Sequence, residues 1–134
     1  MEFFGLDDET IKLIQNLFSE IESIEMVKIF GSRAKGNYKP ASDIDFAIFG
    51  EIDSKGLRHI ACELDELSTP YKFDILNYNE IENQALKESI DNYGKIFYKK
   101  SYFPLKRKDN FLKILKWLKS IFPVFLLKQK SGNY

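Results

Sequence analysis

The chain has 134 residues, of which 44% are hydrophobic and 30% are charged, a balance that predicts a folded domain and excludes a disordered chain. Its single cysteine excludes an internal disulfide, and no uncharged run is long enough to span a membrane, so we expect a cytoplasmic protein. The net charge of zero is unevenly distributed, because residues 1–100 carry −7 and residues 101–134 carry +7. We therefore predict a domain over 1–100, whose acidity disfavours nucleic acid as a partner, and a separate extension over 101–134.

The first predicted elements are a helix over residues 6–22 and a strand over residues 26–30. Asp7 and Asp8 suit the helix N-terminus, because carboxylates accept hydrogen bonds from the free amides and favour the positive end of the helix dipole. Apolar residues then recur at helical spacing up to Ile21. The strand is a short apolar run that ends at a glycine.

A glycine–serine turn follows this strand. Gly31 bends the backbone sharply, and Ser32 leaves its hydroxyl and the nearby amides available. A short helix that starts near Ser32 would aim its first N–H groups at an anion. Gly36 and the polar segment 37–42 predict a loop after this helix.

Two aspartates mark the start of a second predicted strand. Asp43 and Asp45 are two positions apart, which places both carboxylates on one face of a strand. Ile44, Phe46 and Ile48 alternate with them and face the core. A turn that can bind phosphate beside paired carboxylates that can bind a metal ion is typical of enzymes that carry out metal-assisted chemistry on a nucleotide.

The second half of the domain predicts two more helices and two more strands. Asp53 can cap a helix over residues 55–67, and a strand over 71–77 follows. A capping-box pattern starts a helix over 79–92, and a last strand covers 95–98. This alternation predicts an α/β (α+β) domain whose helices cover one face of the sheet.

The pattern Gly-Ser-x-Ala-x-Gly, a short loop and then Ser-Asp-Ile-Asp resembles the DNA polymerase β-like nucleotidyltransferases over residues 6–98. The likeness is greatest to the small single-domain members called minimal nucleotidyltransferases. It implies the polymerase β-like fold with a mixed sheet. It also implies a third aspartate on a later strand, where this chain has Asp74.

The resemblance assigns the three aspartates to metal binding and catalysis. Asp43 and Asp45 would bridge two Mg²⁺ ions, which such enzymes use to stabilise the attacking and leaving oxygens. Asp74 would complete the site that activates the acceptor hydroxyl, either as a metal ligand or as a general base.

The resemblance also implies a nucleotide site with ATP as the substrate. Gly31 and Ser32 would hold the β- and γ-phosphates. Arg33 and Lys35 could neutralise the charge of the triphosphate, although both could equally be solvated loop residues.

Minimal nucleotidyltransferases resemble the antitoxin halves of two-gene toxin–antitoxin modules. The resemblance implies that this chain adds AMP from ATP to a tyrosine hydroxyl of a HEPN-type ribonuclease toxin. One alternative is an antitoxin that neutralises its partner by complexation alone. Another is a nucleotidyltransferase that acts on a small hydroxyl compound or on an RNA end.

The extension over 101–134 combines the basic cluster 106–108 with an apolar stripe at helical spacing over 111–122. Such a segment could lie on a membrane surface, bind a groove of a partner or pack on its own domain. The family resemblance does not reach it.

Overall fold

The computed structural model describes residues 3–101, and Met1–Lys100 group into one compact unit. The basic extension predicted over 101–134 therefore lies outside the described residues except for Ser101. Within residues 3–101, no helix is both long enough and apolar enough to cross a membrane.

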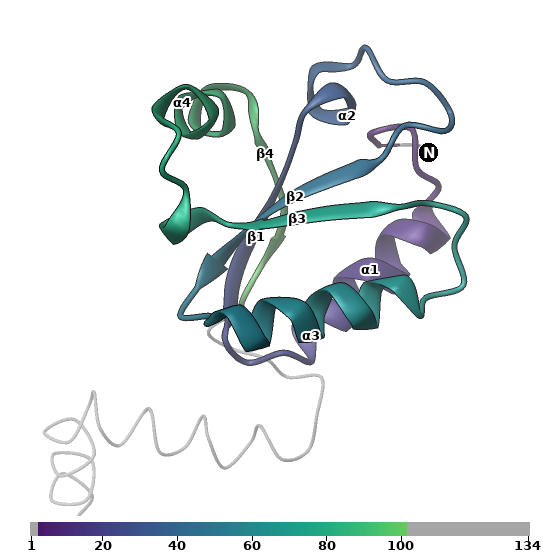
Figure 1. The fold of residues 1–134 in the computed structure, drawn as a ribbon. Coiled ribbons are helices and arrows are strands. Elements are labelled where there is room, and N and C mark those ends of the chain that lie inside the picture. The colour runs from purple at the N-terminus through teal and green to yellow at the C-terminus, as the bar shows by residue number, and fades with distance from the viewer. Residues whose placement is uncertain (1–2, 102–134) are drawn as a thin grey trace, which may run out of the picture. The chain divides into compact units, whose positions relative to one another are not determined.

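Helices and strands alternate in the predicted order, with one additional 3₁₀ turn (Figure 1). The elements are α1 (Asp8–Ser19), β1 (Ile24–Phe30), α2 (Ser32–Lys35), β2 (Ile44–Gly50), α3 (Ser54–Asp65), β3 (Phe73–Asn77), η1 (Tyr78–Glu80), α4 (Gln84–Tyr93) and β4 (Lys95–Lys99). The strands form one sheet in the order β3-β2-β1-β4, in which β2 and β3 are parallel and the other neighbours are antiparallel. The predicted mixed sheet is confirmed.

Aspartates fix the first residues of α1 and α3. Asp7 Oδ1 accepts a hydrogen bond from the Thr10 amide at 2.9 Å, and Asp53 Oδ1 accepts one from the Gly56 amide at 2.7 Å. Each bond satisfies an amide that has no partner inside its helix. Both caps are where the sequence predicts them.

The start of α4 differs from the prediction. The capping box predicted at Asn79 is wrong, because η1 occupies this segment and α4 begins at Gln84. Asn83 is the actual cap, and its side-chain oxygen accepts from the Leu86 amide at 3.1 Å. Two asparagines with similar capping ability lie four residues apart, and local sequence does not rank them.

The main core lies between the sheet and the helices α1 and α3, which run along one side of the sheet (Figure 1). The ring of Phe46 on β2 lies at its centre, with ring centroids 5.3 Å from Phe18 of α1 and 4.9 Å from Phe97 of β4. Because strand residues alternate in direction, burial of Phe46 in this core directs Asp45 and Ala47 to the opposite face.

The opposite side of the sheet carries α2 and α4 (Figure 1). Ala47 and Ile90 are fully buried, yet neither belongs to the core cluster under α1 and α3. The predicted fold class is confirmed, but the prediction that the helices cover one face of the sheet is wrong, because α2 and α4 lie on the second face. Asp45 opens onto this second face, beside α2.

Candidate active site

The turn between β1 and α2 depends on Gly31. This residue has φ 72° and ψ −151°, a conformation that is almost exclusive to glycine. A β-carbon at this position would collide with the carboxylate of Asp45. The absent side chain is therefore what allows the Asp45 carboxylate to lie directly against the turn.

Three aspartates gather beside this turn. Asp45 of β2 pairs in register with Asp74 of the parallel strand β3, so the two side chains share a face. Asp43 precedes β2 by one residue, just before the Ile44 amide donates to the Lys72 carbonyl at 2.9 Å and starts the ladder between β2 and β3. The three carboxylates that the sequence analysis singled out are thus neighbours, since the charges of Asp43 and Asp74 both act on Asp45.

Asp45 is the carboxylate with the most unusual environment. Its pKa is raised from the ordinary value of 3.8 to about 6, chiefly by burial and then by the negative charges of Asp74 and Asp43, while the positive charge of Arg33 opposes this rise. Asp43 and Asp74 are exposed, whereas Asp45 is partly buried. A cation beside Asp45 would offset both its lost hydration and the repulsion from its neighbours.

The donor chemistry of this cluster fits Mg²⁺, which prefers carboxylate oxygens as its protein ligands. Within residues 3–101, no group of three or more His, Cys, Asp or Glu side chains is close enough together to hold a metal ion. Asp43, Asp45 and Asp74 would therefore have to draw together around the ion. The attraction between the cation and the carboxylates would drive that movement, because it would outweigh their mutual repulsion.

The raised pKa of Asp45 predicts a pH-dependent stability of the metal-free protein. Because its pKa is higher in the folded state, this group stabilises the fold fully below about pH 4, and the contribution is lost as the pH rises through about 6. Asp45→Asn should therefore be more stable than wild type by about 1 kcal/mol at about pH 8, allowing for solvent screening, and equal to it near pH 4. Urea unfolding in the presence of EDTA at both pH values measures this difference.

The control for this prediction is Asp65→Asn, because Asp65 is an exposed aspartate at the end of α3. Its effect on the free energy of unfolding should be the same at both pH values. A gain from Asp45→Asn that does not depend on pH would contradict the electrostatic explanation.

Ser32 is the first residue of α2 and directly follows Gly31. Its carbonyl accepts from the amides of Gly36 at 2.9 Å and Asn37 at 3.2 Å, which closes the short helix. Gly36 itself adopts a left-handed conformation with φ 88°. These two hydrogen bonds hold Ser32 beside Gly31 and the Asp45 carboxylate.

Arg33 is buried, whereas a side chain that binds the phosphates of a nucleotide must be accessible. Its side chain is 2% exposed. The guanidinium donates to the carbonyls of Phe4 at 2.8 Å, Ser42 at 2.9 Å and Pro40 at 3.2 Å. The sequence analysis could not foresee this burial, because these carbonyls come from segments that only the folded chain brings together.

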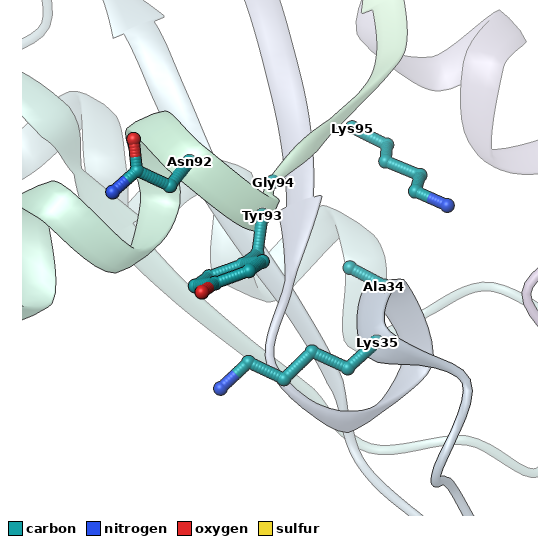
Figure 2. A pocket seen from close by; sticks show the side chains of 6 residues that line it. All are labelled: Ala34, Lys35, Asn92, Tyr93, Gly94 and Lys95. Atoms are coloured by element: carbon teal, nitrogen blue, oxygen red, sulfur yellow. The ribbon is translucent and has the colours of Figure 1, made fainter.

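Lys35 lies at an open surface. Its ammonium is 5.4 Å from the centre of the Tyr93 ring, and Figure 2 shows the two side chains alongside each other. They line an open pocket of about 600 Å³, to which Ala34, Asn92, Gly94 and Lys95 also contribute. In Figure 2 the side chains of Asn92 and Lys95 point away from Lys35, so this pocket has no convergent set of polar groups.

Residues 12–103 match the family described as polymerase beta, nucleotidyltransferase. The chain belongs to this family. The match covers more than half of the chain and includes the turn, the short helix and all three aspartates. The enzyme class of the protein is accordingly that of a nucleotidyltransferase. No curated protein is similar enough to this nucleotidyltransferase to count as a match.

Solved structures share the fold of this nucleotidyltransferase at low sequence identity. A crystal structure of a toxin–antitoxin with AMP-PNP is 19% identical, has a TM-score of 0.53 and covers 92% of each chain. A mutant of the toxin–antitoxin MntA–HpeT is 18% identical, with a TM-score of 0.54 and 94% of each chain covered. A crystal structure from Shewanella oneidensis is 15% identical, with a TM-score of 0.51, and covers 93% of this chain and 94% of the other.

Proposed function

We propose that this nucleotidyltransferase transfers AMP from ATP to a hydroxyl group of a partner protein. The observation that carries the proposal is the position of Asp45, which lies against the Gly31 turn and pairs in register with Asp74. This arrangement joins a phosphate-type turn to a cluster of carboxylates in a member of the polymerase β nucleotidyltransferase family.

The residues of this site would share the work of binding and catalysis. Gly31 and Ser32 would hold the β- and γ-phosphates, since they adjoin the carboxylates. Asp43, Asp45 and Asp74 would hold Mg²⁺, with two ions at full occupancy. When bound, Mg²⁺ supplies positive charge that neutralises the phosphates and lowers the pKa of the acceptor hydroxyl.

Asp74 would also orient the acceptor. Its side chain is exposed, so an incoming hydroxyl can reach it from solvent, whereas Asp45 is partly enclosed. Asp74 could accept the proton of that hydroxyl directly, as a general base within hydrogen-bond reach. The AMP group would then form a bond to the acceptor oxygen, and pyrophosphate would leave.

The partner that we propose is a HEPN-type toxin, and the acceptor is one of its tyrosines, as the resemblance of the sequence implies. The relative with the AMP-PNP ligand supports an adenine nucleotide, because AMP-PNP is an analogue of ATP, and it supports a toxin as partner. Under this proposal the chain acts as an antitoxin that silences its partner by covalent modification.

The experiment combines the full chain, the purified product of the neighbouring gene and ATP labelled at the α-phosphate. We expect label in the partner when Mg²⁺ is present and none when EDTA replaces it. Mass spectrometry should then find AMP on a tyrosine of the partner. Neutralisation of the partner without any label would instead establish complexation alone, and label in added RNA or in a small hydroxyl compound would identify another acceptor.

A further inference from the structure

The side chain of Arg33 links three separate segments of the chain. Arg33 itself lies on α2, directly after Ser32. Its Nη1 donates to the carbonyl of Phe4 in the N-terminal segment. Its Nε and Nη2 both donate to the carbonyl of Ser42, at 3.2 and 2.9 Å, so the guanidinium grips this one oxygen with two bonds.

Two aromatic rings flank the same guanidinium. The centroid of the Tyr38 ring lies 5.2 Å from its central carbon, and that of Tyr71 lies 5.0 Å away. Tyr38 comes from the loop before β2 and Tyr71 from the segment before β3, so the cation also links the approaches to both strands of the site. Burial of a cation is costly unless its donors are satisfied, and therefore these carbonyls and rings are strongly tied to Arg33.

These contacts reach the carboxylates through the backbone. The Ser42 carbonyl belongs to the peptide unit that leads into Asp43, and this unit is planar. Two hydrogen bonds from the same guanidinium hold that carbonyl, and they therefore restrict the position of Asp43 and the path by which the chain enters β2. The backbone of Arg33 directly follows Ser32, so the same residue also ties the Gly31–Ser32 turn to the segment before β2.

We propose that Arg33 is a positioning residue, which holds Asp43 and Asp45 in place against the Gly31–Ser32 turn without touching the substrate. This inference rests on the proposed function of the site. It differs from the sequence-based expectation that Arg33 contacts the triphosphate. A phosphate contact would act mainly on nucleotide binding, whereas misplaced carboxylates act mainly on the rate of transfer.

The test is Arg33→Lys in the full chain. Lysine keeps the positive charge, but its single ammonium cannot reproduce the planar fork that bonds Phe4 and Ser42 together. We expect kcat for label transfer to fall about 10²-fold, while KM for ATP changes less than about threefold. An unchanged kcat, or a loss confined to KM, would overturn the proposal.

A matched control separates positioning from a general loss of stability. Ile60→Val and Leu64→Ala remove core volume from α3, on the side of the sheet away from the carboxylates. The control is whichever of the two has the melting temperature nearer to that of Arg33→Lys. It should keep kcat within about threefold of wild type at a temperature where both variants are folded. An equal loss of kcat in the control would also refute positioning.

If Arg33→Lys does not fold, a second variant can disturb the contacts of Arg33 without changing Arg33 itself. A β-carbon at Gly5 would collide with the Tyr38 ring, which flanks the guanidinium. Gly5→Ala should therefore lower kcat in the same direction, with the same small change in KM. A folded Gly5→Ala variant with the kcat of wild type would count against the proposal.

Hydrogen exchange tests the linkage independently of catalysis. In Arg33→Lys, or in Gly5→Ala in its place, amides over residues 39–45 should exchange faster than in wild type, and those of α3 should not change. Unchanged exchange over 39–45 would overturn the positioning role. If wild type transfers no label at all, the proposed function fails, while the exchange data still decide whether Arg33 holds this segment.

Discussion

Replacing Asp45 by asparagine should lower kcat for nucleotide transfer by about 10³-fold or more while the domain stays folded. Asparagine has nearly the shape of aspartate, so the contact with Gly31 and the strand pairing with Asp74 can both persist. What is lost is the negative charge that would hold Mg²⁺. Asp45 is the partly buried member of the cluster, so bulk water cannot easily replace its carboxylate as a ligand of Mg²⁺.

Initial rates of transfer of labelled AMP, at saturating Mg²⁺ and ATP, measure this effect. Asp43→Asn and Asp74→Asn should also be defective, because each removes one of the other two charges that surround Asp45. Asp65→Asn, an exposed aspartate on α3, is the control and should transfer at the rate of wild type. An Asp45→Asn variant within about tenfold of wild type would exclude the carboxylate cluster as the catalytic centre.

Local signals made some elements of the fold predictable. Asp7 and Asp53 cap their helices through amides only three residues away, so the necessary information lies in one short window. The same kind of signal was misleading at Asn79, where a second asparagine at Asn83 provides the cap that the structure uses. Local chemistry thus predicts that a helix begins but does not choose between neighbouring caps.

The site itself was only partly predictable. The spacing of Asp43 and Asp45 places both near one strand end, but their relation to Asp74 depends on parallel pairing between β2 and β3, with α3 between them in the chain. Only the family resemblance suggested that third position. Arg33 was harder still, because its burial depends on the carbonyl of Phe4, 29 residues away in the sequence. Single side chains that tie distant backbone segments leave no periodic or spacing signal.

Replacing Gly31 by alanine should lower transfer by about 10²-fold or more. The added β-carbon would enter the space of the Asp45 carboxylate, and the backbone conformation, φ 72° and ψ −151°, is strained for any other residue. Relief requires that the turn or the carboxylate moves, and either movement separates Ser32 from the aspartates. We also expect a loss of stability of about 1–3 kcal/mol, measured by urea unfolding beside the transfer assay.

Gly36→Ala separates the two consequences of the Gly31 substitution. Gly36 also has a positive φ, 88°, but a β-carbon there would meet no atom within 4 Å. This variant should therefore lose about 1 kcal/mol of stability from backbone strain alone and keep its transfer rate within about threefold of wild type. If both variants lose transfer equally, strain in the loop is the cause. If Gly31→Ala alone loses it, close contact between the turn and Asp45 is what the reaction requires.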